Sequence, residues 1–182
     1  MKTAPPITAF ARVPSPLGPL LLAASAQGLC GLWFEAQKHL PPWLPAQWDD
    51  APPGDPVLRT TAGQLSEYFS GQRERFDVPL DLRHGTEFQC AVWRAMVDIP
   101  MRGSLSYGAL ARQIGRPAAV RAVGAAVGRN PVGIIVPCHR VMGADGSLTG
   151  YTGGLWRKTA LLRLEQGPPA HTPPGTTHDL FP

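Results

Sequence analysis

The residues best suited to chemistry lie together at positions 134–141, which read Ile-Ile-Val-Pro-Cys-His-Arg-Val. The three branched apolar residues at 134–136 predict a short buried strand, and Pro137, which has no backbone N–H, should end it. Cys138 follows, with His139 and Arg140 next to it. A nearby base or cation lowers the pKa of a thiol and makes it a stronger nucleophile. The segment predicts a reactive cysteine, and the alternative is a structural cysteine beside a surface His–Arg pair.

Positive charge is concentrated in the half of the chain that contains this segment. Residues 1–83 carry seven Lys and Arg against eight Asp and Glu, whereas residues 84–166 carry ten against four. Between Asp98 and Asp145 every residue with a formal charge is an arginine. The guanidinium group suits phosphates and base edges. The distribution favours a nucleic-acid-binding face, although a solvated basic surface is the more common meaning of a charge run.

Length and composition narrow the class of protein. A chain of 182 residues that is 43% hydrophobic can form one domain or two small ones. No stretch approaches the roughly 20 apolar residues of a membrane span, and the first residues lack the apolar core of a signal peptide. The three cysteines, an odd number at scattered positions, argue against a disulfide framework and suit a reducing compartment. We therefore expect a cytoplasmic protein that does not contact a membrane.

The N-terminal half, residues 1–83, predicts a small α/β scaffold. Apolar stretches at 7–13, 20–24 and 29–34 alternate with turn residues and indicate three antiparallel strands. Asp55 and Pro56 can cap and begin a helix whose apolar positions recur at helical spacing up to Phe69. Residues 75–82 could return as a strand. Nothing in this half suggests chemistry.

The C-terminal half, residues 84–166, predicts four helices. Thr86 and Gln89 form a capping box that opens the first, which stops before Pro100. Residues 107–114 and 118–127 follow as two short helices joined by a Gly-containing turn, and Gly128 should end the second in a left-handed conformation. This pair resembles a helix-turn-helix, although an ordinary helical hairpin is more common. Residues 155–165 form the last helix, and residues 167–182 show no periodicity and predict a disordered tail.

The second helix of that pair has an unusual composition. Residues 118–127 are nearly all Ala, Val and Gly, so the backbone of this helix can approach another surface closely. Arg121 is its only long polar side chain. Both features favour DNA as the surface that this helix approaches.

Several motifs in the C-terminal half together resemble one family. Pro137-Cys138-His139-Arg140-Val141, preceded by Asn130-Pro131 and followed by Tyr151-Thr152-Gly153-Gly154, is similar to the O6-alkylguanine-DNA alkyltransferases over about residues 86–166. The resemblance implies an α/β N-terminal domain with a small ribonuclease H-like sheet, followed by a mostly helical domain with a helix-turn-helix. It also implies that the protein is a suicidal methyltransferase, most simply a monomer, that needs no cofactor.

The implied reaction is DNA repair. The base would flip out of alkylated double-stranded DNA, and an alkyl group would pass irreversibly from O6 of guanine to Cys138, once per protein molecule. The alkyl group on O4 of thymine is a further candidate substrate. In this reading a soft sulfur nucleophile attacks the alkyl carbon in line, and a base helps because a free cysteine is only a few per cent thiolate near neutral pH.

The resemblance also assigns roles to individual residues. Cys138 would accept the alkyl group, His139 would deprotonate it through a water molecule, and Glu165 would hold His139. Tyr107 would press on the target phosphate, and Asn130 would tie the second helix to the active-site turn. Arg121 would fill the space of the flipped nucleotide. The implied DNA contacts are Arg121, Tyr107, Ala122, Gly124, Arg129 and Arg140. The implied pocket residues are Val141, Tyr151, Thr152 and Gly153, and Thr152 stands where many members have Ser.

Three alternatives or absences complete these predictions. Some members of the family bind zinc in the N-terminal domain, but Cys30 with His39 or His84 forms no convincing ligand set, so we expect no metal. A DNA-binding sensor without transfer is a second class, and the presence of Cys138 argues against it. A Cys–His hydrolase is a third class, which would turn over repeatedly and would need the imidazole to face the sulfur.

Overall fold

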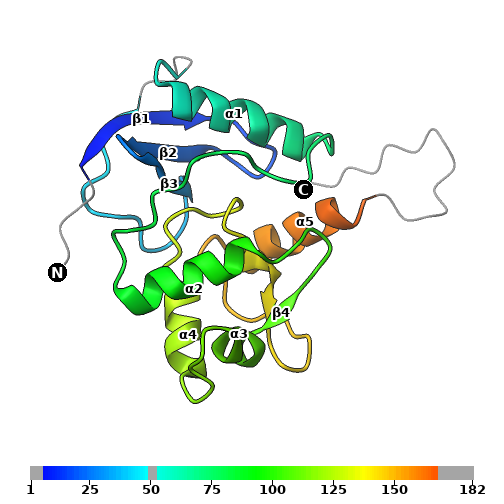
Figure 1. The fold of residues 1–182 in the computed structure, drawn as a ribbon. Helices are drawn as coiled ribbons and strands as arrows, with labels where there is room; N and C mark the ends of the chain where they lie inside the picture. The colour runs from blue at the N-terminus through cyan, green and yellow to red at the C-terminus, as the bar shows by residue number, and fades with distance from the viewer. Residues whose placement is uncertain (1–5, 49–52, 168–182) are drawn as a thin grey trace, which may run out of the picture.

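The computed structural model describes residues 6–48 and 53–167 (Figure 1). Within these ranges the chain forms a three-stranded sheet with one helix, followed by a mainly helical half. In chain order the elements are β1 (Ile7–Val13), β2 (Leu20–Ser25), β3 (Gly28–Phe34), α1 (Pro56–Phe69), α2 (Glu87–Val97), β4 (Leu105–Ser106), α3 (Tyr107–Gln113), α4 (Val120–Val127), the 3-10 helix η1 (Cys138–Arg140), β5 (Val141–Met142) and α5 (Leu155–Gln166). Apart from Gly167, the predicted tail lies outside the described residues.

The three predicted N-terminal strands are confirmed as an antiparallel sheet in the order β1-β2-β3. Side chains of a strand point alternately to its two faces, and here both faces of β2 and β3 are covered. One face packs in the main core with α1, and Figure 1 shows this helix lying along the sheet. The other face is covered by apolar residues of the loop after β3, and its buried members are Leu21, Ala23, Cys30 and Trp33.

Helix α1 begins where the sequence predicts. The Asp55 side chain accepts hydrogen bonds from the backbone N–H groups of Val57 and Leu58, which satisfies two donors that a helix start leaves free. The strand predicted for residues 75–82 is wrong, because Leu80 alone pairs there, in an isolated bridge with Leu29. The Gln64 side chain takes the place of a strand partner, since it bonds both the N–H and the C=O of Asp77.

The helices predicted for the C-terminal half are confirmed to within two residues. The capping box between Thr86 and Gln89 opens α2, and the Ser106 side chain caps α3. Helices α2, α3 and α4 pack against one another, and the Trp93 indole N–H donates to the carbonyl of Ala126 at 2.8 Å. Gly128 is not left-handed as predicted: its φ is −67°, and the chain continues past α4 in a helical turn up to Asn130.

The two halves share one hydrophobic core, which contains buried residues of the sheet, of α1 and of the helical half. The closest backbone contact between them lies at β3, where Leu32 donates to the carbonyl of Pro131 and accepts from the N–H of Gly133, both at 2.9 Å. The sheet therefore braces the segment that leads to Cys138. Among the described residues, no helix has the length and the hydrophobicity that crossing a membrane requires.

Candidate active site

Cys138 is the first residue of the 3-10 helix η1, and Pro137 precedes it. The apolar residues Ile134, Ile135 and Val136 are buried as predicted, but they form turns, so the predicted strand is wrong. The segment bonds to itself, from the N–H of Val136 to the carbonyl of Val132 at 3.0 Å, and Ile134 has a positive φ of 65°. The backbone of this segment therefore bonds within its own turn and not to a neighbouring strand. Cys138 follows at the end of that turn.

Asn130 holds this bend together. Its side-chain nitrogen donates to the carbonyls of Val136 at 2.8 Å and Val132 at 3.3 Å, while its side-chain oxygen accepts from the N–H of Val132 at 3.1 Å. Asn130 follows α4 directly, since its own N–H bonds to the carbonyl of Val127. One amide thus connects the end of α4 to the turn in front of Cys138, which is the position that the family resemblance implies for this residue.

His139 and Glu165 form a buried pair next to Cys138. Nε2 of His139 lies 2.7 Å from Oε1 of Glu165, and their side chains are 0% and 1% exposed. Burial lowers the pKa of His139 and outweighs Glu165, which raises it. Burial alone would raise the pKa of Glu165, but the hydrogen bonds and charges of His139 and Arg140 bring it to about 2.

These pKa directions fix the protonation states near neutral pH. His139 is neutral and donates Nε2–H to the Glu165 carboxylate, which leaves Nδ1 with a lone pair. Among the described residues, Nδ1 of His139 is the buried side-chain nitrogen that has no hydrogen-bond partner. The pair therefore presents an unused proton acceptor beside the cysteine.

The Cys138 thiol is held in a mixed environment. Burial raises its pKa, and a hydrogen bond from Asn130, the positive charge of Lys158 and nearby backbone N–H groups oppose that rise. A thiol in such a place needs a base to become a thiolate at neutral pH. By contrast, Cys30 and Cys90 are buried free thiols, and burial raises the pKa of Cys30 to about 12.

Arg140 is not at the surface, where a DNA contact would require it. Its side chain is buried, with Nη2 and Nε donating to the two oxygens of Glu165 at 2.8 and 3.0 Å and Nη1 donating to the carbonyl of Ile99 at 2.6 Å. All three donor nitrogens face the protein interior, so this arginine cannot reach a DNA phosphate from the surface. The prediction that Arg140 contacts DNA is therefore wrong, and this residue is a buried counter-ion of Glu165.

The structure adds three residues that the sequence analysis missed. Tyr68 of α1 donates to Oε1 of Glu165 at 2.8 Å. Lys158 is fully buried, and its Nζ donates to the carbonyls of Val141 at 2.6 Å and Thr149 at 3.1 Å. Arg157 donates to the carbonyls of Leu17 at 2.9 Å and Gly153 at 2.8 Å. The sequence offers one signal, for two of these residues. Arg157 and Lys158 lie next to each other on α5, and a Lys or Arg that a helix buries needs a partner inside the protein.

Three of the four predicted pocket residues line a cavity at Cys138, and the fourth, Val141, caps the end of η1. Tyr151, Thr152 and Gly153 line a small cavity of about 20 Å³ together with Cys138 and Asn130. The Thr152 hydroxyl donates to the carbonyl of Gly128 at 3.0 Å, and the guanidinium of Arg157 holds Gly153. This cavity has room for about one water molecule.

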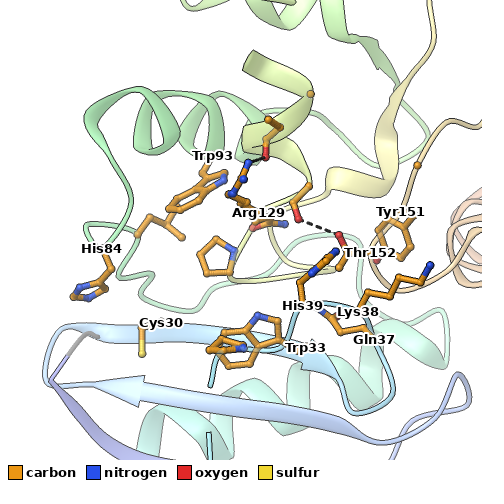
Figure 2. A pocket seen from close by; sticks show the side chains of 18 of the residues that line it. Cys30, Trp33, Gln37, Lys38, His39, His84, Trp93, Arg129, Tyr151 and Thr152 are labelled. Atoms are coloured by element: carbon orange, nitrogen blue, oxygen red, sulfur yellow. Dashed lines mark hydrogen bonds between the residues drawn. The ribbon is translucent and has the colours of Figure 1, made fainter. Parts of the chain in front are cut away.

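A much larger cavity of about 780 Å³ adjoins the small one (Figure 2). The two share Gln37, Gly128, Asn130, Tyr151 and Thr152, and the larger one is also lined by Lys38 and Arg129. Figure 2 shows it between the loop that follows β3 and the residues that follow α4. Its lining includes Cys30, His39 and His84, but no group of three or more His, Cys, Asp or Glu within the described ranges could hold a metal.

The predicted DNA-contact residues lie on and beside α3 and α4. Val123, Ala126 and Val127 of α4 face the core, while Arg121 and Ala122 are exposed and Gly124 is half-buried. Tyr107 begins α3, and a Cβ added at Gly124 would meet its ring at an ordinary van der Waals distance. Arg129 is exposed at the end of α4, where its Nη1 donates to the carbonyl of Ala125 at 3.2 Å. The exposed face of α4 is thus slim, and Arg121 is its one long side chain.

The fold and the site together define a protein with a small sheet domain, a helical domain and a cysteine placed beside a buried His–Glu pair. The family model described as the ribonuclease-like domain of 6-O-methylguanine DNA methyltransferase matches residues 10–82, and that described as its DNA-binding domain matches residues 87–167. The chain belongs to the 6-O-methylguanine DNA methyltransferase family.

Individual relatives support the same assignment. The methylated-DNA–protein-cysteine methyltransferase of Mycobacterium tuberculosis is 48% identical over 160 residues, covering 86% of this chain and 92% of the relative. That of Methanosarcina barkeri is 46% identical over 155 residues, covering 85% and 94%. A crystal structure of the Mycobacterium tuberculosis protein OGT in complex with DNA superposes with a TM-score of 0.75 at 47% identity, covering 86% of this chain and 92% of that one.

Proposed function

We propose that this protein repairs O6-methylguanine in duplex DNA by moving the methyl group to Sγ of Cys138. The observation that carries the proposal is the position of Cys138, directly before a neutral His139 whose Nε2–H is held by Glu165 and whose Nδ1 is free to accept a proton. The relatives named above carry the same activity in their names. The chain would act once, because the thioether that forms is not reversed.

The proposed transfer is a displacement at the methyl carbon. The thiol gives its proton to Nδ1 of His139, directly or through one water molecule, and the sulfur lone pair forms the S–CH3 bond. The CH3–O6 bond breaks with its electrons staying on the base, which takes up one proton from water and becomes guanine, while the imidazolium returns its proton to water. The imidazolium that forms is stabilised by the Glu165 carboxylate, and this charge pair is effective because both side chains are buried. No cofactor enters this balance.

DNA would bind across α3 and α4, used as a helix-turn-helix. A slim helix of small residues suits close approach to a groove, and an exposed Arg121 suits insertion where the flipped nucleotide leaves the stack. Tyr107, Ala122, Gly124 and Arg129 remain the other proposed contacts, since each is at least partly exposed on this side. Flipping costs a few kcal/mol, and an arginine that fills the gap offsets part of that cost.

The flipped base would enter from the larger cavity, and the small cavity at Cys138 would have to widen to admit it. Tyr151 and Thr152 line both cavities, so their loop is one of the segments that would have to move. The family resemblance implies that the carbonyl of Val141 accepts from the guanine amine, and in the structure this carbonyl already accepts from Lys158. A carbonyl oxygen has two lone pairs, so it can accept a second bond.

The test is an intact-mass measurement after mixing the protein with one equivalent of duplex that contains O6-methylguanine, followed by peptide mapping. We expect one methyl group on the peptide that contains Cys138, and no further reaction. Cys138→Ala should still bind the duplex but accept no methyl group, and transfer to this variant would mean that another thiol is the acceptor.

Unmodified wild-type protein that binds the lesion would instead support a sensor, and repeated turnover would support a hydrolase. A monomeric state, a cytoplasmic location and activity on O4-alkylthymine stay predictions.

A further inference from the structure

Tyr68 connects the N-terminal half directly to the site. It lies on α1, is fully buried, and donates from its hydroxyl to Oε1 of Glu165, a residue 97 positions further along the chain. Its ring is packed between Phe69 and Phe76. A buried phenol usually needs a hydrogen-bond partner, and this one has the same carboxylate that holds His139.

Oε1 of Glu165 accepts three hydrogen bonds. The donors are Nε2 of His139 at 2.7 Å, Nη2 of Arg140 at 2.8 Å and the Tyr68 hydroxyl at 2.8 Å. Each donor stabilises the charged carboxylate and makes it less basic. Burial, followed by Glu165, raises the pKa of Tyr68 well above its ordinary value of 10, so the phenol stays protonated and remains a donor.

We propose that Tyr68 is a positioning residue of the methyl-transfer centre, which holds Glu165 so that this carboxylate orients His139 without taking up a proton itself. The inference rests on the proposed function, in which Nδ1 of His139 must be free to accept the thiol proton. With one donor fewer, Oε1 would be more basic and would stabilise an imidazolium before the thiol is deprotonated. A His139 that is already protonated cannot act as the base.

The consequence is a specific change in pH dependence. The other titratable or charged groups around the pair come from η1, from α5 and from nearby loops, and they are Cys138, Arg140, Lys158, Arg102 and Tyr151. Tyr68→Phe leaves all of them in place and removes a single oxygen. Any change in the titration of His139 can therefore be assigned to the hydroxyl.

The experiment compares wild type, Tyr68→Phe and Thr61→Val. Thr61 is a matched control, because it is a fully buried hydroxyl on the same helix that bonds to the carbonyl of Val57 and does not touch Glu165. The second-order rate of methyl transfer is measured with the free base O6-methylguanine and with duplex between pH 5 and pH 9. In parallel, ¹⁵N-histidine NMR follows the titration of His139.

For Tyr68→Phe we expect an acid limb moved upward by roughly half a pH unit to one unit, which makes the transfer rate about three- to tenfold lower on that limb and leaves it nearly unchanged at higher pH, where His139 is neutral. The loss should be the same with free base and with duplex, because the hydroxyl acts on the base and not on DNA. Thr61→Val should match wild type in rate and in pH profile.

Several outcomes would overturn the inference. Unchanged kinetics in Tyr68→Phe would do so, and so would a uniform loss of rate with no shift of the acid limb, which indicates packing alone. If Tyr68→Phe does not fold, 3-fluorotyrosine at position 68 tests the opposite sign: a stronger donor should move the acid limb downward, and no movement would refute the role. A wild-type protein that transfers no methyl group would instead refute the proposed function.

Discussion

Glu165→Gln should destabilise the protein strongly at neutral pH. The carboxylate is 1% exposed and pairs with Arg140, whose side chain is 8% exposed. Removing one partner of a buried ion pair costs about 3–5 kcal/mol, because the other charge stays buried without compensation. The pKa of Glu165 gives an independent figure: a fall from the ordinary 4.5 to about 2 corresponds to about 3 kcal/mol. Both routes therefore lead to a loss of at least about 3 kcal/mol.

The same reasoning fixes how this loss depends on pH. The pKa of Glu165 is lower in the folded protein than in the unfolded chain. The ionised carboxylate therefore contributes its full stability above the unfolded pKa, and this contribution disappears as the pH falls from 4.5 towards about 2. The difference between wild type and Glu165→Gln should be largest at pH 7 and should have lost more than half of its size by about pH 3.

Urea unfolding at pH 7, 5 and 3 measures this difference as a change in the free energy of unfolding. At pH 7 the melting temperature should also fall, by about 6–12 °C for a chain of this size. Glu74→Gln is the matched control, because Glu74 pairs with Arg102 on the surface, where the two side chains are 58% and 60% exposed. An exposed pair contributes about 0–1 kcal/mol. A loss under about 1 kcal/mol for Glu165→Gln, or a loss that is the same at pH 7 and pH 3, would refute the reasoning.

Two further predictions concern DNA. Arg121→Ala should lower the rate of repair in duplex by about tenfold or more and leave the reaction with free O6-methylguanine unchanged, since the side chain acts on the flipped nucleotide; Arg163→Ala on α5, also exposed, is the control, and equal losses with both substrates would contradict the role of Arg121. The logarithm of DNA affinity should fall with the logarithm of salt concentration, with a slope of about −0.9 for each phosphate contacted; an affinity that salt does not change would contradict a basic DNA-binding face.

Much of the fold could be predicted because its signals are local. Asp55 caps α1, Thr86 and Gln89 cap α2, and Ser106 caps α3, each through contacts within three residues. The strands of the sheet follow one another along the chain and are joined by short turns, so their pairing is also local. Elements of this kind are specified by propensity and capping.

The errors arose where distant groups decide the backbone. Ile134, Ile135 and Val136 are equally apolar in a strand or in a buried turn, and the turn is chosen by the Asn130 amide and by the contact of Leu32 with Pro131 and Gly133. The order of apolar and polar residues in the sequence shows neither the Asn130 hydrogen bonds nor the contact with Leu32. The strand predicted for residues 75–82 is absent for a similar reason. The Gln64 side chain bonds the backbone N–H and C=O of Asp77, which a neighbouring strand would otherwise have bonded.

The site shows the same division. The segment around Cys138 predicts a reactive cysteine, the family resemblance implies the roles of His139 and Glu165, and the structure brings His139 and Glu165 into contact. Arg140 was misplaced because a charged residue next to a reactive cysteine looks the same in sequence whether it faces solvent or a buried carboxylate. The burial of Glu165 decides between a solvent-facing and a buried Arg140, since a buried carboxylate requires a buried partner of opposite charge.

The N-terminal half was predicted to be a scaffold, and the contacts argue for a larger part. Tyr68 reaches the carboxylate that holds His139, the carbonyl of Leu17 binds the arginine that holds Gly153, and β3 braces the turn before Cys138. Each contact joins residues from the two halves of the chain, so none of them could be predicted from the spacing of residues within one helix or strand. Because a His–Glu pair can act as a base only while its carboxylate is both charged and fixed, the sheet and α1 contribute to the chemistry by setting that geometry, and a change in their packing should appear first in the pH dependence of transfer.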